Sequence, residues 1–286
     1  MQKTGKWHAA VRDNQQYMHR AGKEEELNIA FWSGQDGCGT TSSMAAIASV
    51  CASAWHMKTI LLQSRNQKSD LNQKLGTAWR TGTGCSAHQP EAEIQDMPKR
   101  GSLVTVRKGR MYYLPQEEYR KKRSYSDAFR EGMCRLIRSA EQHSDITFTD
   151  CGSGDDALSE EILSRADAVV VNLTQERRNL DNYFQGRHVF GEHVIYLVNA
   201  YHPQSAYNRQ NLNRIYRLGK EELAVIPHSQ FFRHASDNGM TEYFVRRHIR
   251  CCGTDRQFYF MQELLHAAAL IRRAAGLEIR EGAKSR

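Results

Sequence analysis

Cysteine pairs with the C-x-x-C spacing and long apolar runs are both missing from this sequence of 286 residues. None of its seven cysteines forms a C-x-x-C pair with another, so neither a zinc site nor a redox motif is indicated. Thiols in this number and spacing are typical of reduced, mostly buried cysteines in a cytosolic protein. No apolar run approaches the ~20 residues that cross a bilayer, and residues 1–26 are too polar for a signal peptide. The sequence therefore predicts a cytoplasmic protein, and contact with the inner face of the membrane is left open.

A strong charge of one sign is also lacking. The chain has 40 Lys and Arg against 32 Asp and Glu, which gives a net charge of +8. This surplus allows contact with nucleic acid or acidic lipid, but most of it is dispersed along the chain, which favours a solvated basic surface. Hydrophobic residues at 40% and charged residues at 25% are ordinary for a globular protein. The length allows one large α/β domain or two small ones.

Short apolar runs alternate with helical patterns along most of the chain. Runs such as 58–63 (KTILLQ), 168–173 (AVVVNL) and 194–199 (VIYLVN) are typical of strands that are buried on both faces. The alternation predicts an α/β fold, with a mostly parallel, doubly wound sheet and helices on both faces. The predicted organisation is a polar tail or surface helix at 1–27, one domain at 28–275 and a C-terminal tail at 276–286.

The stretch 28–50 (NIAFWSGQDGCGTTSSMAAIASV) joins an apolar run to a helical pattern through a glycine-rich turn. Strand, loop and helix in this order are typical of a phosphate-binding loop with the pattern G-x-x-x-x-G-K-[ST], which Gly34, Gly39 and Thr41 fit. Gly37 and Gly39 lack a Cβ, so backbone N–H groups can close around phosphate oxygens. The helix that follows directs its positive end at the same anion. A glycine-rich turn without a ligand is the alternative, and this stretch alone leaves both open.

Two residues of the loop depart from the pattern. Thr40 stands where a lysine would reach the β- and γ-phosphates, and Asp36 adds a negative charge. Weak binding, or binding without turnover, is therefore favoured over ordinary hydrolysis. The hydroxyl of Thr41 or Ser42 is expected either to bind Mg²⁺ or to cap the helix.

Two further strands end in polar residues that belong at the same edge of the sheet. The run 145–150 (DITFTD) ends in Asp150 beside a glycine turn, as a Walker B-like site for Mg²⁺ requires. A carboxylate that only caps the turn is an equally good interpretation. Ligands of parallel α/β sheets bind beyond the carboxyl ends of the strands. The loop, Asp150 and the end of the run 194–199 at Asn199 are therefore predicted to share one site.

These segments together resemble the MinD/ParA-type P-loop ATPases, the SIMIBI class with a deviant Walker A motif, over nearly the whole chain. That family reads K-G-G-x-G-K-T-T where this chain reads QDGCGTTS, so the two family lysines fall on Gln35 and Thr40. The family's I-D-x-D motif aligns with 62–65 (LQSR), where Gln63 replaces an acid. The Walker B-like strand is kept at 149–152 (TDCG).

The resemblance implies ligands, a partner and a set of site residues. It implies ATP or ADP with Mg²⁺, and a homodimer formed through the nucleotide face. Gln35 stands where the family's signature lysine crosses to the partner's phosphates. Asn199 and the segment that ends at Pro227 resemble segments that frame adenine, and no residue is assigned as catalytic beyond Asp150 as a Walker B acid. The implied nucleotide-binding residues are Gly34, Gln35, Asp36, Gly37, Cys38, Gly39, Thr40, Thr41, Ser42, Asn199 and Pro227, and the implied Mg²⁺ ligands are Thr41 and Asp150.

Loss of both lysines and the opening Phe-Trp-Ser-Gly at 31–34 resemble the TadZ/CpaE-like proteins, which place Flp pilus machinery at a site in the cell. This resemblance implies a dimeric scaffold that binds nucleotide, positions a pilus or secretion assembly, and hydrolyses ATP very slowly or not at all. Most proteins of that group carry an N-terminal receiver-like domain. Residues 1–27 are too few to hold one, so we expect this chain to lack it.

The sequence leaves two other functions open. An active ParA-like partitioning ATPase would need a substitute cation, for which Arg65, Arg177 and Arg178 are nearest by element, although each is more typical of a surface arginine. A DNA- or membrane-binding module would use the basic surface. In that case the final amphipathic helix, 258–275, would serve as a MinD-like membrane anchor, but its Ala-rich face favours packing on the sheet.

Overall fold

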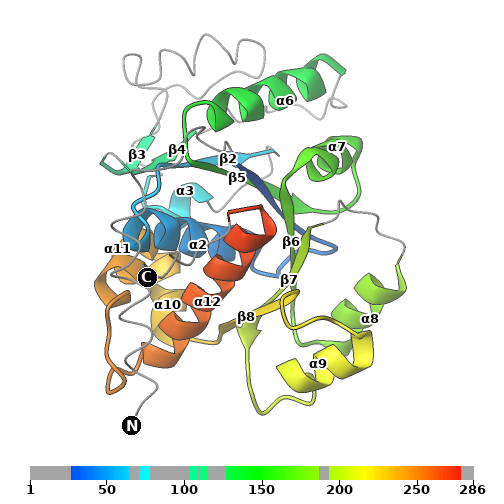
Figure 1. Cartoon of the computed structure of the whole chain (residues 1–286), viewed down its shortest axis with the longest axis vertical. Helices are drawn as coiled ribbons and strands as arrows, with labels where there is room; N and C mark the ends of the chain where they lie inside the picture. Colours follow the sequence, from blue (N-terminus) through cyan, green and yellow to red (C-terminus); the bar gives the residue numbers. More distant parts are fainter. Residues whose placement is uncertain are drawn as a thin grey trace, which may run out of the picture.

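Eight strands form one sheet in the computed structural model, which describes residues 27–64, 71–77, 104–108, 110–114, 127–186 and 193–277. The strand order is β3-β4-β2-β5-β1-β6-β7-β8 (Figure 1). Neighbouring strands are parallel except β3 and β4, which run in opposite directions. The predicted α/β fold with a mostly parallel sheet is confirmed. The strands are β1 (Asn28–Ser33), β2 (Thr59–Gln63), β3 (Val104–Arg107), β4 (Met111–Tyr113), β5 (Ile146–Ser153), β6 (Ala168–Leu173), β7 (Val194–Tyr201) and β8 (Leu223–Pro227).

Helices cover both faces of the sheet (Figure 1). Because side chains of a strand alternate between faces, Phe31 of β1 joins the core under one layer and Trp32 joins the core under the other. The first layer contains α2 (Thr40–Ala54), α3 (Leu71–Lys74), α10 (Gln230–Asp237), α11 (Thr241–His248) and α12 (Phe258–Ala274). The second contains α6 (Asp127–Glu141), α7 (Ala157–Arg165), α8 (Arg177–Gln185) and α9 (Arg209–Tyr216).

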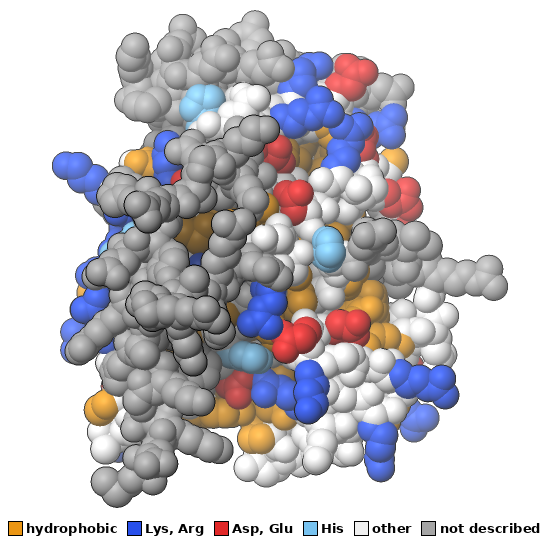
Figure 2. Space-filling model, in the orientation of Figure 1, with side chains coloured by type: hydrophobic (Ala, Val, Ile, Leu, Met, Phe, Trp, Pro, Cys, Tyr) orange, Lys and Arg blue, Asp and Glu red, His pale blue; other side chains and the backbone are white. Residues whose placement is uncertain are grey.

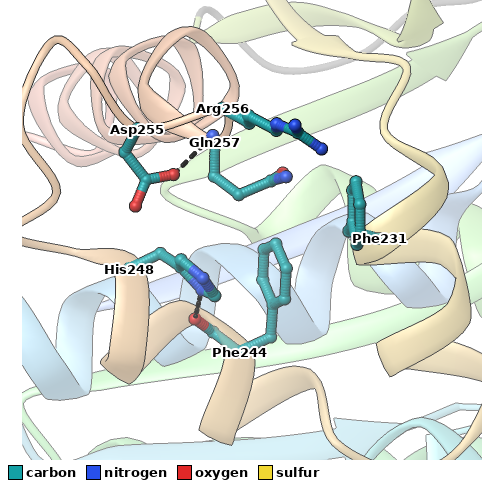
Figure 3. Close-up of a pocket in the computed structure, with 6 residues that line it drawn as sticks. All are labelled: Phe231, Phe244, His248, Asp255, Arg256 and Gln257. Carbon is teal, nitrogen blue, oxygen red and sulfur yellow. Dashed lines mark hydrogen bonds between the residues drawn. The ribbon is translucent and has the colours of Figure 1, made fainter.

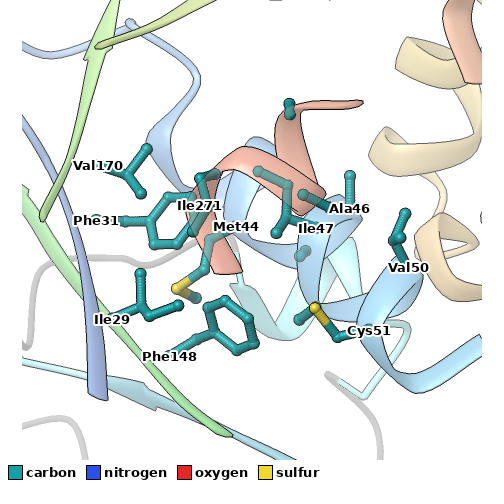
Figure 4. Packing of buried hydrophobic residues seen from close by; sticks show 14 of the residues in the cluster. Ile29, Phe31, Met44, Ala46, Ile47, Val50, Cys51, Phe148, Val170 and Ile271 are labelled. Atoms are coloured by element: carbon teal, nitrogen blue, oxygen red, sulfur yellow. The ribbon is translucent and has the colours of Figure 1, made fainter. Parts of the chain in front are cut away.

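Most residues of helix α2 are buried in the core. Its Met44 and Ile47 pack with Phe31 of β1, Phe148 of β5 and Ile271 of α12, and all five side chains are at most 1% exposed (Figure 4). Burying a side chain of this size contributes about 1.5–3 kcal/mol. The start of α2, and with it the end of the glycine-rich loop, is therefore held in a fixed place against the sheet.

The final helix uses its apolar stripe for packing, as the Ala-rich face favours. Met261, Leu264, Ala268 and Ile271 are buried in the same core as α2. The stripe that a membrane anchor would need is thus occupied by the protein itself. Among the described residues, no helix combines the length and the apolar character that crossing a bilayer requires. On the face seen in Figure 2, Lys and Arg side chains are interspersed with Asp and Glu, as the dispersed charges predict.

Three helices were not predicted, and some bounds differ. Helix α3 lies in a stretch read as polar, and α10 and α11 occupy a segment for which no element was predicted. Helix α9 begins at Arg209, because Asn208 caps its first turn by accepting a hydrogen bond from the Asn211 N–H. The glycine- and proline-rich stretch 78–101, the basic segment 117–123, residues 1–26, the tail beyond Leu277 and Arg65 lie outside the described residues.

Candidate phosphate-binding site

The glycine-rich loop connects β1 to α2 at the carboxyl edge of the sheet, between the ends of β5 and β6. Gly37 and Gly39 have φ angles of 81° and 82°, a left-handed conformation that costs side-chain-bearing residues energy. A Cβ at Gly39 would also lie 3.4 Å from Cβ of Asn199. Gly39 is the N-cap of α2 and no side chain caps the helix, so the interpretation of Thr41 or Ser42 as a cap is wrong. The first backbone N–H groups of the helix have no acceptor within the helix, so they can donate hydrogen bonds to an anion.

The Thr41 hydroxyl donates a hydrogen bond to Asp150, with 2.6 Å between Oγ1 and Oδ2. Asp150 is 3% exposed, and its other oxygen accepts the N–H of Gly152 at 2.9 Å. The carboxylate therefore caps the turn and also faces the loop, and its role as a Walker B-like Mg²⁺ ligand stays a prediction. A hydroxyl and a carboxylate in contact at the base of a phosphate-binding loop are oxygen ligands of the kind Mg²⁺ prefers.

The loop is tied to the turn after β5. The Asp36 carboxylate accepts a hydrogen bond from the Ser153 hydroxyl. The Trp32 indole N–H donates to the carbonyl of Gly154 at 2.8 Å, and the Ser33 hydroxyl donates to the carbonyl of Gln35 at 2.9 Å. These bonds fix the side of the loop that carries Gln35 and Asp36. Asp36 is exposed, and its negative charge stands at the rim of the loop.

A buried amide network supports the other side of the loop. Asn199 donates through Nδ2 to the carbonyl of Cys38 at 2.8 Å and to Oδ1 of Asn172 at 2.9 Å. The same Asn172 oxygen accepts a hydrogen bond from the Ser43 hydroxyl at 2.7 Å. The Asn172 side-chain N–H donates to the carbonyl of Trp32 at 3.2 Å. β6 and β7 thereby hold the loop from below. Asn199 uses its N–H groups on the loop carbonyl of Cys38 and on Asn172, so it lies beneath the loop. Its predicted contact with adenine stays a prediction.

Three further residues support the loop and were not predicted from the sequence: Asn172, Ser43 and Asn179. Asn172 is a polar residue inside the apolar run AVVVNL and is fully buried, which was the available signal, because a buried amide requires partners. Asn179 lies at the start of α8, with its Nδ2 3.4 Å from the sulfur of Cys38. No comparable signal marks Ser43, which looks like any small helical residue.

The charges around the loop are negative. Burial raises the pKa of the Cys38 thiol to about 11, the hydrogen bond from Asn179 opposes this shift, and the carboxylates of Glu176 and Asp36 add to it. Cys38 therefore stays a neutral thiol. Burial, and to a lesser extent the charge of Asp150, raises the pKa of Tyr113 well above its ordinary value. An anion at this loop would meet Asp36 and Asp150 without the two lysines of the family pattern, so a divalent cation is needed to balance the charge.

The remaining predicted residues lie where their strands and helices place them. Gln63 ends β2 next to β5, where its Oε1 accepts the Tyr113 hydroxyl at 3.4 Å. Pro227 ends β8 beside Tyr201 of β7, and it is buried. Arg177 points to solvent with 80% of its side chain exposed and pairs with Asp181 at 3.1 Å, and Arg178 is exposed as well. Neither arginine is placed as a substitute for the missing lysines.

No dedicated metal cage is present in the described part of the chain, where no group of three or more His, Cys, Asp and Glu is arranged to hold an ion. A Mg²⁺ site built from Thr41 and Asp150 does not need one, because Mg²⁺ is commonly held by one or two protein oxygens together with water and substrate phosphates.

No protein-family model and no curated protein matches the sequence, whereas solved structures match it over most of its length. The ParA family ATPase from Chlorobium tepidum is 15% identical, with a TM-score of 0.63 over 85% of this chain and 99% of that chain. MinD from Pyrococcus horikoshii, solved with Mg-ADP, is 15% identical, with a TM-score of 0.62 over 87% and 97%. Cyanothece McdA with ATP is 12% identical, with a TM-score of 0.61 over 89% and 98%.

The chain has the fold of the MinD/ParA P-loop ATPases. At these identities the likeness establishes the fold alone. Within the MinD/ParA fold the glycine-rich loop, the Asp150 turn and the Asn199 strand end lie together, as the sequence predicts for a single site.

Proposed function

We propose that this chain is a dimeric nucleotide-binding scaffold of the MinD/ParA type that positions a pilus or secretion assembly, as TadZ/CpaE-like proteins do, with ATP hydrolysis very slow or absent. The domain at 28–275 carries this function, and the ligand is ATP or ADP with Mg²⁺. In this proposal the backbone of the loop 34–41 holds the phosphates, and Thr41 and Asp150 hold the metal ion. The bound Mg²⁺ supplies the positive charge that the loop lacks.

The observation that carries the binding proposal is the contact between Thr41 and Asp150 at 2.6 Å beside a loop with two left-handed glycines. A glycine-rich turn without a ligand has no need to place a hydroxyl against a buried carboxylate. Two solved structures with this fold, from Pyrococcus horikoshii and Cyanothece, contain Mg-ADP and ATP respectively, which supports the same ligand class.

The proposal of slow turnover rests on three residues. Thr40 and Gln35 replace cations and Gln63 replaces an acid. By analogy with the loss of one oxyanion donor, each replacement removes about 2–4 kcal/mol of transition-state stabilisation. The three effects need not add, because such groups act as a unit. Even one of them slows the chemical step roughly a hundredfold.

Nucleotide binding is tested by calorimetry with ATP and ADP, with and without Mg²⁺. We expect Mg²⁺-dependent binding that Asp150→Ala and Gly39→Val both weaken, since one removes the metal partner and the other puts a branched side chain in the cradle. Asp155→Ala is the control, because Asp155 is an exposed acid on the same turn. If neither variant changes the affinity while circular dichroism shows an intact fold, the loop is only a turn.

Turnover is tested by phosphate release under the same conditions. We expect a rate near background for the unmodified protein. Robust hydrolysis that Asp150→Ala abolishes would instead establish the partitioning-type ATPase. The positioning role is tested separately, by following a fluorescent fusion in the native cell and by asking whether deletion of the gene disperses the pili or the secretion complexes.

A further inference from the structure

Helix α11 has an inner side that packs on the protein and an outer side that faces solvent. On the inner side Thr241, Phe244 and Val245 are buried. Phe244 and His248 line a pocket that α11 shares with α10 and the start of α12 (Figure 3). The outer side consists of exposed residues at helical spacing, from the N-cap of α11 to the turn that follows it. These residues are Met240, Tyr243, Arg246, Arg247 and Arg250.

The outer side of α11 combines large apolar side chains with arginines. Met240 is 45% exposed and Tyr243 is 43% exposed. The Arg246 guanidinium carbon lies 5.4 Å from the centre of the Tyr243 ring, and Nη1 of Arg247 lies 3.5 Å from the Tyr243 hydroxyl. Exposed apolar and aromatic side chains between basic residues are typical of helix surfaces that contact a bilayer.

The β3–β4 hairpin adds cations beside α11. The Glu242 carboxylate lies 3.1 Å from Nε of Arg246 and 3.8 Å from Nε of Arg107, which ends β3. Lys108 follows Arg107 and is exposed. Glu242 thus joins the hairpin to the outer side of α11, and its one negative charge is shared between two arginines. In Figure 2, Lys and Arg side chains project along the left edge of the molecule, where Figure 1 places β3 and α11.

The turn after α2 brings the hairpin and the end of α11 together. The carbonyl of His56 accepts a hydrogen bond from the Arg110 guanidinium. Burial lowers the pKa of His56, and the charges of Arg110, Arg107 and Arg250 lower it further, so these three guanidinium groups lie around one imidazole. Residues of three elements therefore form one surface, here called the basic face. Its cations are Arg107, Lys108, Arg110, Arg246, Arg247 and Arg250.

We propose that the basic face docks on the surface of a bilayer that contains acidic phospholipids, with Met240 and Tyr243 among the headgroups and the arginines against the lipid phosphates. Each Lys or Arg close to an anionic leaflet strengthens such binding, and guanidinium groups form strong charged hydrogen bonds to phosphate. The two exposed apolar side chains add contact with the headgroup layer. The docking surface differs from the final helix, whose apolar stripe is buried, and it does not depend on nucleotide binding.

The exposed apolar side chains favour a bilayer over the other polyanions. The backbone of duplex DNA presents phosphates and sugars, which leave Met240 without an apolar partner. A protein partner is held mainly by side chains buried in pockets at the centre of an interface, whereas Met240 and Tyr243 stand on the solvent side of a helix. A headgroup layer accepts protruding apolar groups and basic side chains together.

The test is flotation of the full-length protein with two kinds of vesicle. One kind is phosphatidylcholine alone, and the other is phosphatidylcholine and phosphatidylglycerol in equal parts. We expect the protein to float with the mixed vesicles only, and less of it as the salt concentration rises, because exposed charges are screened. Soluble glycerol phosphate, at the concentration of the lipid headgroups, should not release the protein, since it offers neither a charged surface nor an apolar layer.

Three variants locate the contact on the outer side of α11. Arg247→Glu and Arg250→Glu each reverse a charge and should weaken vesicle binding at least about tenfold. Met240→Ser keeps the charges and should weaken it roughly threefold to tenfold through the lost apolar contact. All three side chains are exposed, so these variants are expected to fold, and thermal unfolding checks this.

The matched controls are Arg214→Glu and Ile215→Ser, an exposed arginine and an exposed apolar residue of α9 in the other helix layer. They should leave vesicle binding unchanged. The proposal is overturned if the mixed vesicles do not bind, if phosphatidylcholine alone binds equally well, or if the α11 variants bind as the parent does. Release by glycerol phosphate would instead establish a site for free phosphate. Duplex DNA that binds through the same arginines, while the vesicles do not, would overturn the proposal in favour of nucleic acid.

Discussion

Asp36 is the residue at which the loop is least suited to an anion. Its carboxylate stands at the exposed rim of the loop, held by the Ser153 hydroxyl, where the MinD/ParA pattern has glycine. Replacing it by glycine removes a like charge near the phosphates. We expect Asp36→Gly to tighten ATP binding roughly threefold to tenfold at low salt, as the removal of one charge a few ångströms away predicts.

Salt dependence distinguishes this effect from a change in loop shape. The gain should shrink as the ionic strength rises, because exposed charges are screened. Ser153→Ala is the matched variant, since it removes the hydrogen bond and keeps the charge. Calorimetry at low and high salt measures both. A gain for Ser153→Ala as large as that for Asp36→Gly would show that the bond, and not the charge, limits binding.

Thr40 is the position at which a lysine can be restored to the loop. Its buried side chain lies at the start of α2, where the family lysine would reach the phosphates. We expect Thr40→Lys to tighten nucleotide binding without normal turnover, because Gln63 still replaces the acid. Calorimetry and phosphate release on the same preparation test this. A variant that hydrolyses ATP at an ordinary rate would show that Gln63 does not limit the chemistry.

At the scale of elements, the sequence predicts the long buried strands well and the short helices poorly. β6 was predicted with its observed bounds, because AVVVNL is a continuous apolar run buried on both faces. Helix α3 is four residues long and α10 and α11 are eight each, which is too short for a reliable helical period. Their positions depend on contacts with distant parts of the chain, which local spacing does not contain.

The same limit applies to the site. Gly37, Gly39, Thr41 and Asp150 follow from local patterns, because each sits at a turn or a strand end. The support beneath the loop cannot be predicted from local patterns, because Asn172 of β6 and Ser43 of α2 meet only after the sheet has formed. Asn199 was predicted as a ligand contact from its strand end, and its hydrogen bonds to Cys38 and Asn172 could not be read from the sequence.

The contact between α3 and the α10–α11 turn allows a test of packing. Gly76 and Gly239 have φ angles of 65° and 72°, and a Cβ on Gly239 would lie 2.5 Å from Cα of Gly76 and 2.8 Å from the carbonyl oxygen of Gln73. Because these are backbone atoms, the two segments must separate. We expect Gly239→Ala to lower the free energy of unfolding by about 2–4 kcal/mol in urea titrations.

Gly276→Ala is the control for this prediction. Gly276 has a φ of 96°, and no atom of the described residues lies within 4 Å of its Cβ position, so it reports the backbone strain alone, about 1–2 kcal/mol. The difference between the two variants measures the close approach. If both variants lose the same free energy of unfolding, then α3 can move away from the α10–α11 turn at no cost, and this contact does not hold the two helices in place.

At the scale of the whole molecule, the proposal is a dimer that forms through the carboxyl edge of the sheet. The resemblance to MinD/ParA proteins implies a dimer through this edge, in which the signature lysine of one copy reaches the phosphates of the other. Here Gln35 stands in its place, and its amide forms weaker hydrogen bonds to phosphate than a charged group does. In the proposed dimer, the nucleotide would therefore contribute less to association than it would with a lysine at this position.

We expect the dimer to depend little on nucleotide. Sedimentation velocity of the protein without nucleotide, with ADP and with ATP, each with Mg²⁺, should give dimerisation constants within about tenfold of one another, a difference of at most ~1.4 kcal/mol. Gln35→Lys is the matched variant, and it should restore a dimer that ATP strengthens, because the charge can again cross to the partner's phosphates. A parent protein that is a strict monomer alone and dimerises only with ATP would contradict this account, since the weak Gln35 contact would then suffice to couple the nucleotide to assembly.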